Sequence, residues 1–230
     1  MREIDEIYTE MPYYGRRKIT AQLRRQGYEV NPKRVRRLMA KMGLEAIYPR
    51  PKVKTGSQAQ AHQIYPYLLR NLVIERPNQV WSTDITYIPM HQGFMYLTAI
   101  IDWFSRYIST WELSNSLDGH FCQAALQRAL THAKPDIFNT DQGVQFTANA
   151  FTNILKQAEV KISMDGRGRA LDNIFIERFW RSLKYELIYP NDFRYVPELT
   201  AALEDYFHRH NHRRLHQSLK YFTPAEVHFA

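Results

Sequence analysis

The stretch QVWSTDITYIPMHQGFMYLTAIIDWFSRYISTWEL, residues 79–113, decides the fold. Three runs within it, 79–90, 94–102 and 106–113, are rich in β-branched and aromatic residues, a composition typical of strands. The turn residues His-Gln-Gly at 91–93 separate the first two runs. Short connections between successive strands predict an antiparallel meander.

After residue 113, the sequence predicts helices with two short strands between them. Apolar residues recur at helical spacing in four segments, 117–133, 148–158, 172–188 and 196–211, and two short strands are predicted at 136–140 and 160–164. The order βββαβαβαα indicates an α/β fold in which a mixed sheet is flanked by helices.

Upstream of the strands, the chain is helical and strongly basic. The first 54 residues carry 14 basic and 6 acidic residues, whereas the remainder carries 17 of each, so the first quarter holds the whole net charge of +8. Short helices are predicted at 3–8 and 16–25, and a third begins after an Asn31 N-cap and ends near Gly43. The basic residues around its apolar stripe are Lys33, Arg34, Arg36, Arg37 and Lys41.

This pattern predicts a helix-turn-helix-like DNA-binding domain over residues 1–47, with an affinity for DNA that falls as salt rises. The simpler alternative is the solvated basic face of a small helical bundle. Residues rich in Pro, Gly, Ser, Gln and Lys follow, so we predict a linker over 48–71 and a catalytic body over 72–230.

Composition excludes several classes of protein. Cys122 is the single cysteine, which rules out an internal disulfide or a multi-cysteine zinc site and favours a reducing compartment. No apolar run approaches the roughly 18 residues that suggest a membrane span, and the first residues, MREIDEIYTE, have no apolar signal-peptide core. We therefore expect an intracellular, cytoplasmic protein without a membrane partner.

Three acids occupy unusual settings. Asp84 interrupts the β-forming run WSTDITY, where the burial of a carboxylate needs a compensating cation, arginine or hydrogen bond. Asp141 follows a short predicted strand, and Glu177 lies on the polar face of a predicted helix. Taken singly, each aspartate is more simply a residue that caps its own backbone, and Glu177 an ion-pair partner of Arg181.

Taken together, these acids predict a metal site. Thirty-five residues separate Asp141 from Glu177. Three carboxylates converging at one sheet edge would repel one another unless divalent cations neutralised them, and all-oxygen ligands suit Mg²⁺ or Mn²⁺. Two such ions about 4 Å apart support phosphodiester chemistry. Lys184, two helical turns beyond Glu177, and Arg181 are the candidate DNA contacts beside the metals.

Several other polar residues receive a structural interpretation. We interpret Asp102 as a buried acid satisfied by Ser105 and Arg106, Asn173 and Asp172 as N-cap residues, and the tryptophans as core or rim. Four histidines cluster near the end of the chain, namely His208, His210, His212 and His216. No cysteine or acid completes a zinc site among them, so a basic, aromatic surface that touches DNA is the better interpretation.

The ordered set of motifs resembles a known family. The segments are NQVWSTDITYIP, YLTAIIDWFSRYI, NTDQGVQFT, ISMDGRGRALDNIFIERFWRSLKYE and FHRHNHRRLHQSLKYFTPAEV, preceded by YYGRRKITAQLRRQGYEVNPKRVRRLMAKMGLEAIYPRP. Together they resemble the catalytic (OrfB-type) protein of insertion-sequence transposases of the IS-three family, within the retroviral-integrase superfamily. The resemblance runs from about Met11 to Val227.

The resemblance implies a ribonuclease-H-like core with a DDE triad at Asp84, Asp141 and Glu177. It also implies Mg²⁺-dependent DNA cleavage, followed by attack of a free 3′-hydroxyl on a target phosphodiester, with Lys184 contacting DNA ends. The implied partners are element ends and target DNA in the nucleoid, further copies of the chain on that DNA, and a second element-encoded DNA-binding protein, since relatives usually have a longer N-terminal extension. The alternatives are a ribonuclease-H-like nuclease that does not join strands and a truncated DNA-binding remnant that acts as a regulator.

Overall fold

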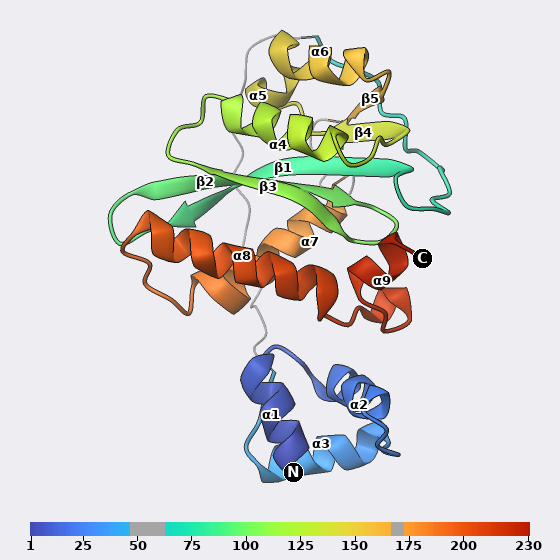
Figure 1. Ribbon diagram of the computed structural model, residues 1–230, viewed down its shortest axis with the longest axis vertical. Helices are drawn as coiled ribbons and strands as arrows, with labels where there is room; N and C mark the ends of the chain where they lie inside the picture. The colour runs from blue at the N-terminus through green and yellow to red at the C-terminus, as the bar shows by residue number, and fades with distance from the viewer. Residues whose placement is uncertain (47–62, 167–172) are drawn as a thin grey trace.

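A computed structural model describes residues 1–46, 63–166 and 173–230, and it divides into a helical head and an α/β body (Figure 1). The head consists of α1 (Arg2–Glu10), α2 (Arg16–Arg25) and α3 (Pro32–Lys41). Its small core is built from apolar side chains on all three helices, and Leu215 of the body completes it. The head is therefore packed against the body and shares part of its core with it.

Local sequence explains where α3 begins and ends. The Asn31 side chain accepts a hydrogen bond of 2.8 Å from the Arg34 backbone N–H, which satisfies one of the free donors of the first turn. Pro32 supplies a first helical residue that needs no such partner. Gly43 has a φ of +67°, the left-handed conformation that commonly ends a helix. The predicted N-cap and terminator are both confirmed.

The body contains a five-stranded sheet in the order β3-β2-β1-β4-β5. The strands are β1 (Val80–Pro89), β2 (Phe94–Asp102), β3 (Ile108–Ser114), β4 (Ile137–Thr140) and β5 (Lys161–Met164). Strands β1 to β3 pair antiparallel, as the predicted meander requires, while β4 pairs parallel with β1 and β5 parallel with β4. The predicted mixed sheet is confirmed, and β1 lies at its centre.

Helices cover both faces of the sheet (Figure 1). One face carries α4 (His120–Leu130), α5 (Val144–Thr147) and α6 (Asn149–Gln157), whose apolar residues pack with Trp81 and Phe138. The other face carries α7 (Ile174–Leu183) and α8 (Val196–His212), which pack with Val80 and Leu97. The short helices η2 (Gln217–Leu219) and α9 (Pro224–His228) end the chain. The layers fit the three-layer arrangement of an α/β fold.

Two helix predictions need correction. The segment 172–188 is not one α-helix, because α7 ends at Leu183 and a π-helical turn, η1 (Lys184–Ile188), follows it. The segment 117–133 contributes only the eleven residues of α4, since Gly119, with a φ of +86°, begins the helix. Helix α5 was not predicted. Asp172 lies outside the described residues.

Residues just upstream of the sheet also belong to the packed body. Leu69 is buried in the same core cluster as residues of α7 and α8, and the Leu68 backbone N–H donates to Ser163 Oγ at 3.0 Å. Tyr65 N–H lies 3.5 Å from Met164 Sδ. The predicted linker 48–71 thus includes residues that contact β5, and its portion 48–62 lies outside the described residues. The domain boundaries stay predictions, but these contacts favour a body that begins before residue 72.

Asp102 has the structural role predicted for it. Its buried carboxylate accepts hydrogen bonds of 2.7 Å from the Ser105 backbone N–H, the Ser105 hydroxyl and the Asn78 backbone N–H. The Arg106 backbone N–H donates to the Asp102 carbonyl. Three donors offset the burial of this charge, so Asp102 fixes the turn after β2.

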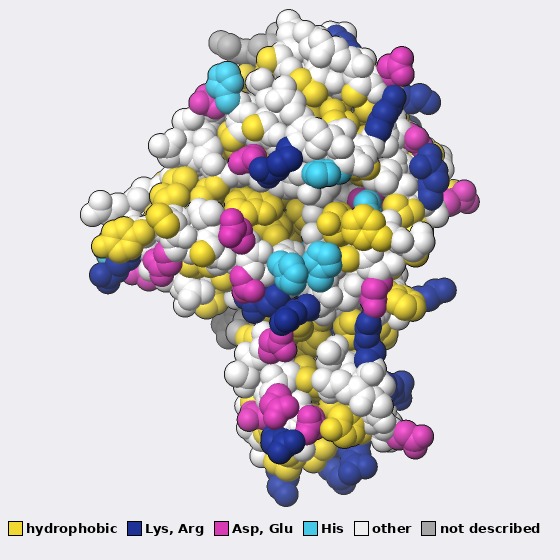
Figure 2. All heavy atoms as spheres, in the orientation of Figure 1, with side chains coloured by type: hydrophobic (Ala, Val, Ile, Leu, Met, Phe, Trp, Pro, Cys, Tyr) yellow, Lys and Arg dark blue, Asp and Glu magenta, His cyan; other side chains and the backbone are white. Residues whose placement is uncertain are grey.

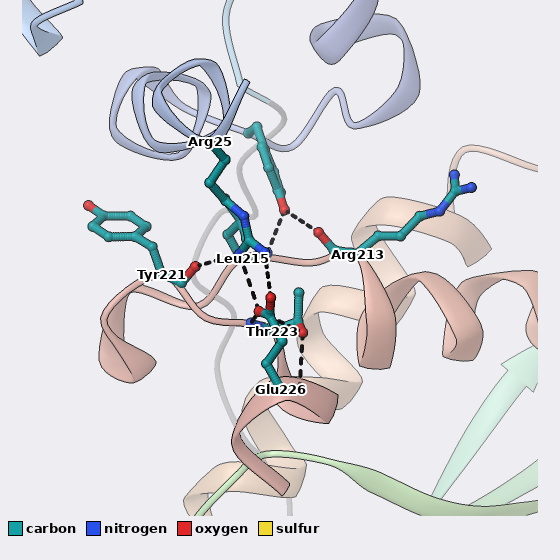
Figure 3. Close-up of polar contacts among 7 residues, drawn as sticks. Arg25, Arg213, Leu215, Tyr221, Thr223 and Glu226 are labelled. Carbon is teal, nitrogen blue, oxygen red and sulfur yellow. Dashed lines mark hydrogen bonds and ion pairs between the residues drawn. The ribbon is translucent and has the colours of Figure 1, made fainter. Parts of the chain in front are cut away.

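Head and body are joined by polar contacts (Figure 3). The Tyr14 hydroxyl accepts from the Leu215 backbone N–H at 2.6 Å and lies 3.3 Å from the Arg213 carbonyl, to which it donates. Arg25 on α2 forms an ion pair with Glu226 on α9, and Glu10 on α1 pairs with Arg213. Within the described residues, no helix has the length and apolar character of a membrane span.

Candidate catalytic and DNA-binding sites

The pairing of β1 with β4 brings two predicted acids to the same level of the sheet. The two strands are parallel, with Ser82 opposite Asn139. Asp84 and Asp141 each follow their paired residue by two positions, and residues two apart in a strand point to the same face. The side chains of Asp84 and Asp141 therefore emerge near one another, where β4 ends.

Asp84 is partly buried and lies in a field of negative charge. Burial, followed by the negative charges of Asp141 and Glu177, raises the pKa of its carboxyl to about 7. Hydrogen bonds from the Ile85 N–H and from Trp180 act in the opposite direction. Trp180 Nε1 donates to Asp84 Oδ2 at 3.1 Å. Neither of these hydrogen bonds comes from a positively charged group, so they do not neutralise the charge of the Asp84 carboxylate.

Asp141 lies one residue beyond β4 and is exposed. Its Oδ1 accepts from the Gly143 backbone N–H at 2.9 Å, a bond that holds the carboxylate against the following turn. The surrounding protein displaces water and raises the pKa of Asp141, while the Gly143 bond lowers it. A Cβ atom at Gly143 would stand 2.9 Å from Asp141 Oδ1, so the close approach of the carboxylate depends on glycine.

Glu177 is exposed on the first turn of α7. The helix begins at Asn173, whose side chain does not cap the helix as predicted but donates to the Thr83 carbonyl of β1 at 3.1 Å. Asn173 occupies the N-cap position, but its side-chain oxygen accepts no hydrogen bond from the first turn, and its amide N–H group bonds to the strand instead. Asn173 therefore fixes the start of α7 beside Asp84.

The donor chemistry of this region fits a hard divalent cation. Its ligands would be carboxylate oxygens, and burial together with the negative charges of Asp141 and Glu177 raises the pKa of Asp84. In the described parts of the chain, no three His, Cys, Asp or Glu side chains stand close enough together to hold one ion. The structure thus brings Asp84 and Asp141 together and Glu177 within electrostatic reach, but not into a closed ligand cage.

Lys184 and Arg181 follow Glu177 along the same segment. Burial lowers the pKa of the Lys184 ammonium, and the negative charge of Asp84 opposes that shift, so Lys184 lies near the acidic group. It is the first residue of the π-helical turn η1, a feature that sequence periodicity did not reveal and that is frequent at functional sites. Arg181 is exposed one helical turn after Glu177.

The basic residues of α3 form a second candidate surface. All five, Lys33, Arg34, Arg36, Arg37 and Lys41, are exposed, while Val35 and Met39 are buried on the opposite side of the helix. Figure 2 shows Lys and Arg side chains gathered at the end of the head that points away from the body. The arrangement fits a helix that presents positive charge to a polyanion.

The histidine cluster does not behave as one surface. His210 is buried and its Nε2 lies 3.1 Å from the Arg106 carbonyl, while burial lowers its pKa to about 3. Burial also holds the pKa of His216 well below its ordinary value. Both are neutral and belong to the interior, so the predicted basic surface is wrong for this pair. His208 and His212 are exposed.

Comparison with known families defines the class of the body. A family model described as an integrase core domain matches residues 74–170, a second integrase core model matches residues 158–224, and an HTH-like domain model matches residues 1–52. The catalytic core domain of HTLV-2 integrase, solved in complex with magnesium in a dimeric form, superposes with a TM-score of 0.54 at 18% identity. The match covers 68% of this chain and 99% of that one. The body has the ribonuclease-H-like fold of integrase core domains, and the head is an HTH-like domain.

Sequence similarity then resolves the family within that class. The transposase for insertion sequence element IS629 of Shigella sonnei is 34% identical over 229 residues, which are 98% of this chain and 77% of that protein. The transposase InsF for insertion sequence IS3A of Escherichia coli is 33% identical over 184 residues, 78% of this chain and 64% of that protein. The chain belongs to the insertion-sequence transposases and is a DNA transposase of the IS-three family, an integrase-type polynucleotidyl transferase.

Proposed function

We propose that Asp84, Asp141 and Glu177 are the catalytic residues of this transposase and that they bind two Mg²⁺ or Mn²⁺ ions. The observation that carries the proposal is the parallel register of β1 and β4, since Asp84 and Asp141 each follow the paired Ser82 and Asn139 by two residues. The effect of Glu177 on the pKa of Asp84 supports a place for the glutamate in the same group. The HTLV-2 integrase core, which has this fold, was solved with magnesium.

Each side chain has a distinct task in this proposal. Bound between the carboxylates, a pair of cations would activate the attacking oxygen and stabilise the leaving oxygen of a phosphodiester. Asp84, on the central strand, is the rigid ligand, and Gly143 N–H orients Asp141. Glu177 approaches from α7. The Lys184 ammonium, close to Asp84, binds a DNA phosphate next to the cations, and the exposed Arg181 adds a further phosphate contact.

The head binds DNA independently of the cations. We propose that Lys33, Arg34, Arg36, Arg37 and Lys41 contact phosphates of element ends or target DNA, because all five are exposed on one helix of an HTH-like domain. We further propose that several copies assemble on DNA in the nucleoid, with a second element-encoded protein as a partner in end recognition. The HTLV-2 integrase core, which was solved as a dimer, supports an assembly of copies.

The proposal is tested with labelled element ends, plasmid DNA and Mn²⁺. Wild-type protein should give joined products, whereas Asp141→Asn should give none yet retard DNA as the wild type does, because the substitution removes metal-binding charge and leaves α3 intact. Joining by the Asp141→Asn variant would overturn the assignment of Asp141. Nicking by the wild type without joining would favour a nuclease, and retardation alone would favour a DNA-binding regulator.

A further inference from the structure

Trp180 of α7 and Asn173, the residue just before this helix, form hydrogen bonds with the strand that carries Asp84. Asn173 Nδ2 donates to the Thr83 carbonyl, and Trp180 Nε1 donates to Asp84 Oδ2, each at 3.1 Å. Asn173 precedes Glu177 by four residues and Trp180 follows it by three. Positions i, i+4 and i+7 lie on one face of a helix, so the glutamate stands between the two bonds on the side of α7 that faces β1.

Both bonds are protected from water. Asn173 is 6% exposed and Trp180 is 5% exposed, and hydrogen bonds in such surroundings are stronger than the same bonds in solvent. One acceptor is the main chain of the residue before Asp84, and the other is the Asp84 carboxylate itself. The helix that carries Glu177 is thereby tied to the backbone and to the side chain at one point of β1.

The chemical type of the second donor suits a metal ligand. The indole N–H only donates, carries no charge and cannot bind a cation. It occupies Oδ2 of Asp84 and orients the carboxylate, but unlike an arginine it does not neutralise the charge that a cation requires. The ring of Trp180 also packs against Phe179, with centroids 5.2 Å apart. A phenylalanine at position 180 would retain that packing but would lack the N–H donor, so packing alone does not explain the hydrogen bond to Asp84.

We propose that Trp180 and Asn173 are positioning residues that orient Asp84 and set its distance from Glu177, and that metal affinity depends on them. The inference rests on the proposed role of Asp84 and Glu177 as metal ligands. Partners that orient metal ligands typically contribute 10- to 100-fold to metal affinity. Trp180 acts directly on the carboxylate, whereas Asn173 acts through the backbone of Thr83, so the loss of Trp180 N–H should have the larger effect.

Calorimetric titration of the whole 230-residue chain with Mn²⁺ tests the inference. We expect Trp180→Phe to weaken Mn²⁺ binding about tenfold while DNA retardation by the head stays unchanged. The matched control is Trp103→Phe. Trp103 is also buried, and its Nε1 donates to Ser82 Oγ at 2.8 Å on the same strand, but to a hydroxyl rather than a carboxylate. This control should bind Mn²⁺ with the wild-type affinity.

A third variant separates the inference from the function on which it rests. Asp84→Asn should lose Mn²⁺ binding. If it does, and Trp180→Phe binds Mn²⁺ as tightly as the wild type, the positioning role is wrong and the metal site stands. If Asp84→Asn keeps the wild-type affinity, the metal site itself is wrong. Should Trp180→Phe fail to unfold cooperatively, Asn173→Ala decides: a several-fold loss of affinity supports the inference, and an unchanged affinity overturns it.

Discussion

A methyl group at position 143 would collide with the carboxylate of Asp141. The added Cβ would stand 2.9 Å from Asp141 Oδ1, closer than such atoms approach in proteins, and the backbone φ of −63° at this residue suits alanine as well as glycine. Gly143→Ala should therefore act through the displaced carboxylate rather than through backbone strain. We expect about a tenfold loss of Mn²⁺ affinity, measured by calorimetry, with unfolding in urea little changed.

The control for this prediction is Gly15→Ala. Gly15 also has a negative φ, and its added Cβ would meet only the Ala46 side chain at an ordinary contact distance of 3.9 Å. This variant should keep the wild-type Mn²⁺ affinity. Equal losses in both variants would mean that the effect of Gly143→Ala is not local to Asp141.

Lys18 places an ammonium group in the junction between head and body. Burial, together with the positive charge of Arg214, lowers its pKa to about 7, although Glu186 opposes the shift. Below about pH 7 the lysine is charged in both states, and folding bears the full penalty of burying that charge. From pH 7 to 10.5 the unfolded chain binds more protons at this site than the folded chain, so the unfolding free energy rises with pH.

Lys18→Met should remove this penalty. We expect the variant to be more stable than the wild type at pH 6, with the difference shrinking between pH 7 and 10.5, because there the wild-type lysine becomes neutral in the folded state. Urea denaturation at a series of pH values measures the difference in unfolding free energy between the variant and the wild type. A stability difference that does not change over this range would show that Lys18 is solvated as a free lysine is.

At the scale of elements, the π-helical turn η1 is held to the end of α8 by a buried ion pair. Glu186 forms a bidentate pair with Arg214, with Arg214 Nη2 at 2.7 Å from Glu186 Oε1, and the side chains are 7% and 9% exposed. Tyr206 on α8 donates to the same carboxylate at 2.7 Å. Removal of one member of such a pair leaves an uncompensated buried charge.

Glu186→Gln should destabilise the protein by about 3 kcal/mol in denaturant titration. The control, Glu112→Gln, breaks an ion pair with Arg128 in which the arginine side chain is 49% exposed, and exposed pairs contribute about 0–1 kcal/mol. If the two variants lose equal stability, solvent reaches the Glu186–Arg214 pair and its burial contributes nothing.

Helix α3 is the element on which DNA affinity should depend. Arg36→Ala combined with Arg37→Ala removes two exposed charges. The slope of log affinity against log salt should therefore become less steep, by the amount that about two phosphate contacts contribute. The matched control combines Arg76→Ala and Lys134→Ala on the body, where each residue is held in an ion pair. Filter-binding at several salt concentrations measures both. An unchanged slope in the α3 variant would move DNA recognition to another surface.

Sequence patterns predicted the positions of strands β1 to β3 well, but they did not predict where the α-helix in segment 172–188 ends. β-branched and aromatic runs lie where β1 to β3 form, and β2 agrees with its prediction residue for residue. The apolar stripe over 172–188 fits a continuous α-helix. The π-helical turn that begins at Lys184 does not change this apolar spacing, so the sequence does not reveal it. Asp141 was singled out because it directly follows a predicted strand. The β1–β4 register, which places Ser82 opposite Asn139, depends on long-range strand pairing that local patterns do not encode.

The hydrogen-bond partners of the site residues come from distant parts of the chain, so local sequence patterns do not predict them. The sequence indicates that Trp180 is a core or rim residue, and Trp180 is buried, but its hydrogen bond to Asp84 was not predicted. Asn173 has the residue type of an N-cap, yet the Thr83 carbonyl captures its side chain. In both cases the hydrogen-bond partner lies on another element, and local sequence patterns do not reveal such a partner.

At the scale of the whole molecule, the head is fixed to the body while its basic helix stays open. Figure 1 shows α3 at the end of the head farthest from the sheet, and Figure 3 shows Arg25 of α2 directed toward Glu226 of the body. Tyr14 bridges the same junction through the Arg213 and Leu215 backbone. In the proposed function, this division lets one surface of the head dock on the body while α3 contacts DNA, and the docking fixes the separation between α3 and the proposed catalytic residues.

The Arg25–Glu226 pair should make this docking sensitive to acid. The hydrogen bond from Arg25 lowers the pKa of Glu226 to about 2, so its stabilising effect is complete above pH 4.5 and is lost as the pH falls toward 2. Both side chains are about 40% exposed, which limits the contribution to about 1 kcal/mol or less. Glu226→Gln should therefore be less stable than the wild type at pH 7, with a difference that narrows below pH 4.5. Tyr14→Phe should lose about 1–3 kcal/mol equally from pH 7 down to about pH 3, since it strands buried backbone groups without changing charge. Urea titrations in which the stability difference of Glu226→Gln also stays constant below pH 4.5 would exclude ionic docking.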